Sequence, residues 1–220
     1  VAVRNTQLMC VPAPTLDLVG LRENGKTRWD QFCASILKIN TPVKVLHVSR
    51  SGQYLFVLSD FGFGWAKSVD VAFGTSREID TFAAPRDFIV CTTDRQQVYI
   101  DESCTVSAGS IRLGDRLPVV DASNPRLVRI PARTSTGRLI AETAWLADDA
   151  SYTVGWTPYT RRNVITMALT MLDNTYDWTG AWLGRQHETT YRDIFACFGF
   201  ELPYHGALFT FFNDNDTQVL

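Results

Sequence analysis

Several side chains that could take part in catalysis or metal binding occur in the stretch "GRQHETTYRDIFACFGFELP", from Gly184 to Pro203. His187 stands at the start of a predicted amphipathic helix, where an imidazole can act as a base or as a metal ligand. With Glu188 and the later His205 it forms an incomplete set of ligands, because a metal site needs a third well-placed residue. We therefore interpret His187 as a solvated residue at a helix start, and we expect no metal and no cofactor.

Nucleophiles near His187 are poorly placed for catalysis. Cys197 follows on the same predicted helix, about 15 Å further along its axis at 1.5 Å per residue. Thr189 and Thr190 are close, but a threonine hydroxyl needs an adjacent base to become a nucleophile. The sequence therefore offers no catalytic residue in this stretch.

Two helices must position these residues. The first is expected over residues 160–172 with Thr160 as its N-cap, and the second over residues 189–198 with Gly199 as its end. Each shows one apolar stripe at helical spacing. The two stripes comprise Val164, Met167, Ala168, Met171 and Leu172, and Tyr191, Ile194, Phe195 and Phe198.

The chain before these helices has the pattern of short strands. "PVKVLHVSRSGQYLFV" alternates apolar and polar residues on both sides of a Ser-Gly turn, which predicts a hairpin with His47 on a strand face. Residues 33–37 belong to an arm that is either helical or extended. Five more short runs between residues 82 and 150 predict a second small barrel. We interpret Trp65 and Trp145 as barrel core residues.

Composition excludes several classes of protein. The net charge is −2 with 20% charged residues, so no basic surface for nucleic acid is expected. The longest apolar runs are far too short to span a membrane. The five cysteines are odd in number and form no CxxC pair, which argues against a zinc site. Free thiols are the simplest interpretation, although one or two disulfides stay open.

The last third of the chain resembles a known family. "PYTRRN", "YDWTG", "RDIF" and "FGFELP", preceded by two small barrels, are similar to the bacterial cell-wall endopeptidases that join SH3-like domains to an NlpC-type cysteine peptidase domain. Members of that family cut the γ-D-glutamyl–diamino acid bond of peptidoglycan stem peptides. The resemblance implies an exported protein of the periplasm or cell envelope.

The resemblance also supplies a fold and domain limits. It implies a mainly β protein with additional α-helices, in which two SH3-like β-barrels precede the helical front of a papain-like (NlpC-type) α+β domain without its sheet. The limits are residues 1–78 for the first barrel, 79–152 for the second, and 153–220 for a degenerate, truncated peptidase segment. Candidate substrate-groove residues follow from it. They are Tyr176, Asp177, Trp178, Trp182, Arg185 and His187.

The catalytic residues of the family have no counterpart here. Its Gly-Arg is followed by Asp-Cys-Ser, and Gln186, His187 and Glu188 occupy those positions. The cysteine chemistry requires a thiolate at the helix start, which a histidine cannot replace. After Pro203 too few residues remain for the strands that would carry the family's catalytic histidine.

Three functions remain open. The first is a non-catalytic pseudo-peptidase that binds murein stem peptides or a protein partner. The second is a subunit or fragment of an active cysteine peptidase, and the third is a structural subunit that reuses the fold. The apolar stripes need a cover, either from the second barrel, from the segment "GALFTFF" or from another chain. We expect a protein partner or self-association, with Phe209, Phe211 and Phe212 in the contact.

Overall fold

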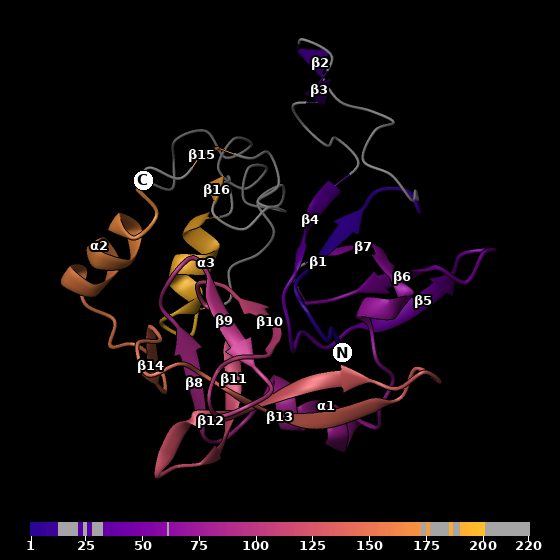
Figure 1. Ribbon diagram of the computed structural model, residues 1–220. Helices are drawn as coiled ribbons and strands as arrows, with labels where there is room; N and C mark the ends of the chain where they lie inside the picture. The colour runs from indigo at the N-terminus through magenta and orange to yellow at the C-terminus, as the bar shows by residue number, and fades with distance from the viewer. Residues whose placement is uncertain are drawn as a thin grey trace.

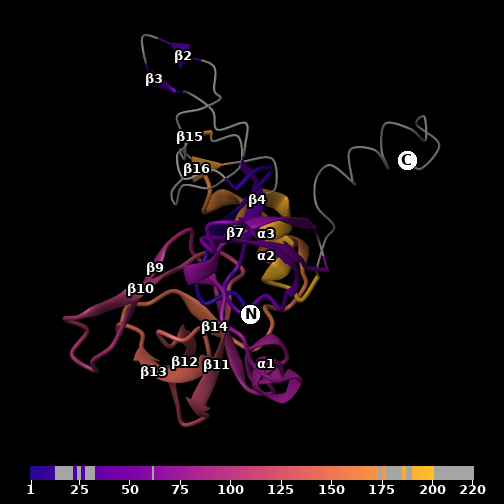
Figure 2. The same ribbon diagram turned by 90° about the vertical axis from the view of Figure 1, so that its right-hand side faces the viewer.

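The computed structural model describes residues 1–12, 22–23, 26–27, 33–60, 62–172, 175–176, 185–186 and 190–200. Strands outnumber helices in this part of the chain, and two antiparallel sheets dominate it. In Figure 1 the first sheet lies at the right, the second sheet below it, and helices α2 and α3 at the left. Figure 2 shows the two helices above the second sheet and beside the first.

The first sheet has five strands in the order β4-β1-β7-β6-β5. Their bounds are β1 Thr6–Met9, β4 Cys33–Leu37, β5 Lys44–Val48, β6 Tyr54–Leu58 and β7 Phe63–Lys67. β5 and β6 form the predicted hairpin, and β4 decides the open question about residues 33–37, which are extended. Alternation along β6 directs Leu55 and Val57 into the core of this sheet, with Phe56 between them on the outer face.

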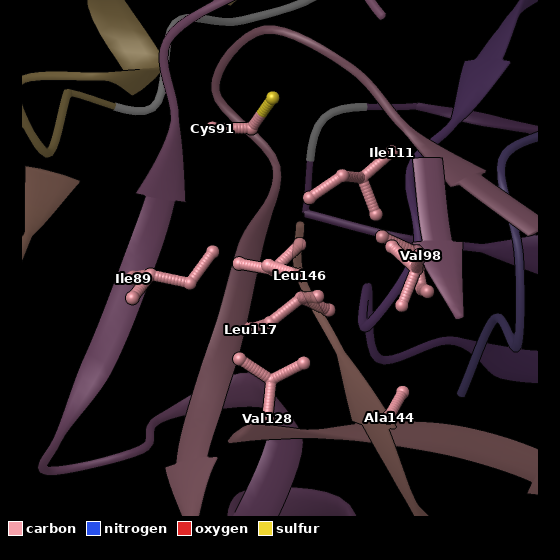
Figure 3. Packing of buried hydrophobic residues seen from close by; sticks show 9 residues of the cluster. Ile89, Cys91, Val98, Ile111, Leu117, Val128, Ala144 and Leu146 are labelled. Atoms are coloured by element: carbon pink, nitrogen blue, oxygen red, sulfur yellow. The ribbon is translucent and has the colours of Figure 1, made fainter. Parts of the chain in front are cut away.

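The second sheet has seven strands in the order β10-β9-β13-β12-β11-β8-β14. Their bounds are β8 Phe88–Cys91, β9 Gln96–Tyr99, β10 Ser107–Ile111, β11 Arg116–Asp121, β12 Asn124–Arg133, β13 Leu139–Trp145 and β14 Tyr152–Val154. Figure 3 shows how Ile89, Leu117, Val128 and Leu146 fill its core. The sequence predicted five strands here, and β10 and β14 are additional.

Three α-helices and a 3-10 turn complete the regular structure that is described. They are η1 Ser68–Asp70, α1 Ser76–Ala83, α2 Arg161–Leu169 and α3 Thr190–Ala196. α1 was not predicted. It begins with a capping box in which the Thr75 hydroxyl accepts from the Glu78 N–H while the Glu78 carboxylate accepts from the Thr75 N–H.

The two later helices begin and end largely as predicted. The Thr160 hydroxyl accepts a hydrogen bond from the Asn163 N–H at the start of α2. Gly199 has a φ of +83°, the left-handed conformation that ends a helix. Short pairs also occur between β2 (Arg22–Glu23) and β3 (Lys26–Thr27), and between β15 (Thr175–Tyr176) and β16 (Arg185–Gln186).

The second sheet covers part of the predicted apolar stripes. Met167 and Met171 of the α2 segment pack with Ile194 and Phe198 of the α3 segment against Val90 of β8 and Leu113 of the β10–β11 turn. Ala168 and Leu172 were expected in the same stripe, but both are exposed. The second barrel was one of the three covers considered. Phe209, Phe211 and Phe212 lie outside the described residues, so their predicted burial stays a prediction.

No helix in the described part of the chain is long and apolar enough to cross a membrane.

Candidate functional site

The structure brings the two flanks of the predicted substrate loop together. β15, which contains Tyr176, pairs in parallel with β16, which begins at Arg185. The backbones of Thr175 and Arg185 are therefore partners across this short ladder. Asp177, Trp178, Trp182 and His187 lie outside the described residues, as does His205. Their assignment to a substrate groove stays a prediction.

A buried ion-pair network holds α3 against both sheets. Asp193 on α3 accepts from Lys38, which follows β4, at 2.8 Å and from the Arg112 guanidinium beside β10 at 3.0 Å. The Arg112 and Asp193 side chains are 3% and 2% exposed. A carboxylate this deeply buried is stable only when it is paired and hydrogen-bonded, so the three residues depend on one another.

A second carboxylate extends this network to the N-terminal segment. Asp115 accepts from the Asn5 side chain at 2.6 Å and from the Arg112 backbone N–H at 2.9 Å, and Lys38 lies 3.8 Å away. Burial raises the pKa of Asp115, while Lys38 opposes that shift. Asn5 in turn accepts from the Ile39 N–H. The network therefore joins the first sheet, the β10–β11 turn and α3.

Gly114 lets α3 approach this turn closely. Its φ is +76°, and a Cβ at this position would lie 2.6 Å from the Asp193 carbonyl oxygen and 2.8 Å from the Ala196 Cβ. Glycine is the residue that satisfies both the left-handed backbone and the tight contact. Gly114 falls inside one of the five short runs that were predicted as strands, and nothing in the sequence indicated that α3 packs against it.

Cys10, Cys91, Cys104 and Cys197 are free thiols, and the buried Cys91 and Cys197 are not prepared for nucleophilic attack. Burial raises the pKa of Cys197 to about 12. Burial likewise raises the pKa of Cys91 far above its usual range. Because the thiolate is the reactive form, both side chains are inert near neutral pH. Within the described ranges no three His, Cys, Asp or Glu side chains are arranged to hold a metal ion.

Aromatic side chains form a row across the outer face of the first sheet. His47, Phe56 and Trp65 are direct cross-strand partners on β5, β6 and β7. The ring centroids of Trp65 lie 5.3 Å from Phe56 and 5.9 Å from His47, and Phe56 lies 6.0 Å from Phe63. We call these four residues the aromatic row. His47 and Phe63 are exposed, and Phe56 and Trp65 are half-buried, so the row is accessible to a ligand.

The core assignment of Trp65 and Trp145 was wrong. Both side chains are half-buried rather than enclosed. Trp65 lies between Gly64 and Ala66, which are buried, so the alternation of the strand directs the indole to the outer face. That alternation is visible in "FGWAK" and could have placed Trp65 correctly. For His47 the predicted strand-face position is confirmed.

Comparison with known proteins places the row in a recognised domain. Residues 21–67 match the family model for the SH3 domain of the SH3b1 type. This range contains β4 to β7 and all four residues of the aromatic row. No curated protein matches the sequence.

Two solved structures share the fold. One is an NlpC/P60 endopeptidase from Photobacterium damselae subsp. piscicida, with a TM-score of 0.75 and 17% identity over 92% of this chain and 43% of that one. The other is an NlpC/P60 family protein from Bacillus cereus ATCC 10987, with a TM-score of 0.62 and 16% identity over 91% of this chain and 72% of that one.

The chain thus spans less than half of the Photobacterium protein. At such low identity the likeness concerns the fold. The fold resemblance to SH3-containing NlpC/P60 proteins is confirmed in this coarse form, whereas a γ-D-glutamyl specificity and a truncated peptidase domain stay predictions.

Proposed function

We propose that this chain is a non-catalytic, cell-envelope protein that binds peptidoglycan stem peptides through its first SH3-like domain. The observation that supports this most directly is the accessible aromatic row inside the SH3b1-type segment. Solved proteins with the same fold include an NlpC/P60 endopeptidase. A binding role is compatible with the loss of a nucleophile, because shape and polar groups can persist when chemistry is lost.

Trp65 is the natural anchor of such a site. Phe56 packs against one side of the indole and His47 meets it edge-on, so the ring is held in place before a ligand arrives. The diamino acid of a stem peptide carries an ammonium group, and a cation over an exposed indole contributes about 0.5–1 kcal/mol. A dissociation constant on the order of 1 mM requires about 4 kcal/mol, so the indole contact is one of several contacts that the site must supply.

The residues argue against peptide hydrolysis. By resemblance, His187 stands where the family has its cysteine, and it cannot form a thioester. Cys91 and Cys197 are buried thiols with raised pKa values, so they do not supply the missing thiolate. The alternative of an active peptidase in several chains would need a partner that brings both a nucleophile and its base.

Titration of muropeptides into the protein by calorimetry tests the binding proposal. We expect Trp65→Leu to weaken binding about fivefold or more, the equivalent of about 1 kcal/mol. Trp145→Leu is the matched control, because Trp145 is also half-buried but belongs to the second sheet. Equal affinities of the wild type and Trp65→Leu would remove the aromatic row from the proposal.

A protein partner is a second candidate, and one feature favours it. Ile165 and Leu169 lie four positions apart on the side of α2 away from Met167, and Leu172 lies in the turn that follows; the three side chains are between 51% and 61% exposed. We call these three residues the exposed α2 face. A large apolar side chain that stays in water instead of being buried costs on the order of 1.5–3 kcal/mol. We propose self-association or a partner chain through this face, which also fits a structural subunit.

A further inference from the structure

A lysine stands beside the indole of Trp65 on the outer face of the first sheet. Lys67 follows Trp65 by two positions on β7, so the two side chains leave the strand on the same face. Ala66 between them is buried in the core, whereas Lys67 is exposed. At about 3.3 Å per residue, the Cα atoms of Trp65 and Lys67 are about 7 Å apart. The ammonium group of Lys67 can therefore reach a ligand that lies on the Trp65 ring.

Lys67 is available to a ligand, because no carboxylate in the described part of the chain pairs with it. The nearest carboxylate in the sequence, Asp70, is buried, accepts from the Thr6 hydroxyl at 2.7 Å and pairs with Arg4 at 3.3 Å. None of the ion pairs among the described residues includes Lys67. The five strands of the first sheet contain no aspartate or glutamate. A carboxylate of a ligand would therefore meet a free cation next to Trp65.

Trp65 and Lys67 together suit a group that carries both signs of charge. The face of an indole attracts an ammonium group, and the ammonium group of a lysine attracts a carboxylate. The side chain of diaminopimelate ends in a carbon atom that bears both an ammonium group and a carboxylate. The side chain of lysine, the other common diamino acid, ends in an ammonium group alone. The two diamino acids therefore differ in the charge that Lys67 would contact.

We propose that Lys67 determines which diamino acid the site accepts, by binding the side-chain carboxylate of diaminopimelate while Trp65 holds the adjacent ammonium group. The inference rests on the proposed function, because it requires stem peptides to bind at the aromatic row. It goes further by predicting a preference for diaminopimelate over lysine at the third residue of the stem peptide. Because an exposed ion pair is weak, this preference should be about threefold to fivefold.

Lys44 provides a matched control on the same face of the sheet. It is the cross-strand partner of Leu58, which follows Phe56 by two positions on β6, so Lys44 also belongs to the outer face. Like Lys67, it is exposed. It lies on β5, two strands away from β7, and the spacing of residues and strands places its Cα about 12 Å from that of Trp65. Replacement of Lys44 therefore removes the same charge without removing the proposed contact.

NMR titration of the whole chain with L-Ala-γ-D-Glu-diaminopimelate and with L-Ala-γ-D-Glu-L-lysine tests the proposal, because the two peptides differ in one carboxylate. We expect the wild type to bind the diaminopimelate peptide about threefold to fivefold more tightly, with shifts of the Trp65 indole N–H and the Lys67 amide. Lys67→Gln should bring the ratio of the two dissociation constants to about one. Lys67→Arg should keep the preference, and Lys44→Gln should leave it unchanged.

The outcomes separate this inference from the proposed function. If the wild type bound both peptides equally and Trp65→Leu weakened both, the role of Lys67 would be overturned while stem-peptide binding would stand. A preference that persists in Lys67→Gln, or one that disappears in Lys44→Gln, would also overturn that role. No binding of either peptide at about 10 mM would overturn the proposed function and this inference with it. Lys67 and Lys44 are exposed, so their variants should fold, and the amide spectra check this.

Discussion

The ammonium group of Lys38 lies 2.8 Å from the carboxylate of Asp193, and the two side chains are 14% and 2% exposed. Lys38 follows the last residue of β4, whereas Asp193 belongs to α3, so this contact ties the first sheet to the C-terminal helix. Arg112, which follows β10, pairs with the same carboxylate. Asp193 therefore connects all three parts, and Asp115 adds a second link between the first sheet and the β10–β11 turn.

Replacement of Asp193 should be costly. Asp193→Asn removes the carboxylate that pairs with Arg112 and the nearer of the two carboxylates beside Lys38, and loss of one partner from a buried pair costs about 3–5 kcal/mol. Urea unfolding should show this loss in the free energy of unfolding. Glu78→Gln is the control, since the exposed Glu78–Arg138 pair contributes about 1 kcal/mol or less. Similar losses for the two variants would show that the buried network does not hold the parts together.

Gly114 should tolerate no side chain. In Gly114→Ala the new Cβ meets the backbone of Asp193, so α3 must shift, and we expect destabilisation of about 2–4 kcal/mol. Gly52→Ala has a similar φ of +70° and open space around the Cβ, so it measures the backbone strain alone, about 1 kcal/mol. Thermal unfolding of both variants separates the two effects. Equal melting temperatures would mean that the contact with α3 is absent in solution.

The exposed and the buried cysteines should differ in how fast they are alkylated. Cys10 is exposed and should react with iodoacetamide at pH 8, whereas Cys91 and Cys197 should react only after unfolding in guanidinium. Burial keeps both of these thiols protonated, since it raises the pKa of Cys197 to about 12. Mass spectrometry of peptide digests locates the labels. Fast labelling of Cys197 in the folded protein would favour the alternative of an active peptidase.

The same burial predicts how stability changes with pH. A thiol whose pKa is raised by folding stabilises the protein fully below its unfolded value of 9.0, and the contribution is lost as pH rises toward about 12. The free energy of unfolding should therefore fall across this range. In Cys197→Ala the free energy of unfolding should fall less steeply with pH, because this variant lacks the thiol that ionises on unfolding. If the free energy of unfolding fell equally with pH in the wild type and in Cys197→Ala, the burial of the Cys197 thiol would be contradicted.

The exposed α2 face should drive association. Sedimentation velocity of the wild type should show oligomers that increase with concentration, and Leu169→Glu should return the chain to a monomer by placing a charge in the contact. Val69→Glu is the control, because Val69 is 58% exposed on η1 and lies outside that face. A monomeric wild type at every concentration would remove self-association from the account and leave a different partner chain to consider.

Local patterns in the sequence predicted the local structure well. The β5–β6 hairpin followed from alternation around a Ser-Gly turn, and the start of α2 followed from Thr160 as an N-cap. α1 was missed although Thr75 and Glu78 carry the capping-box spacing, because its short length and few apolar residues gave a weak periodic signal. β10 was missed because "SAGSI" has small residues in place of the branched and aromatic ones that favour strands.

The site was harder to predict because its residues meet only through the fold. Arg112 and Asp193 are 81 positions apart, and no periodicity relates a lysine after one strand to an aspartate on a helix. The aromatic row was within reach, since His47, Phe56 and Trp65 each occupy an outward position of its strand. The pairing register of β5, β6 and β7, which places these three side chains next to one another, could not be predicted from the sequence.

Equilibrium dialysis of the peptide L-Ala-γ-D-Glu-diaminopimelate against the protein, with mass spectrometry of the peptide on both sides, tests the central claim most directly. A protein that binds stem peptides without cutting them predicts an excess of peptide on the protein side and an unchanged mass after prolonged incubation. Equal concentrations of intact peptide on the two sides, or the appearance of L-Ala-D-Glu and free diaminopimelate, would contradict it.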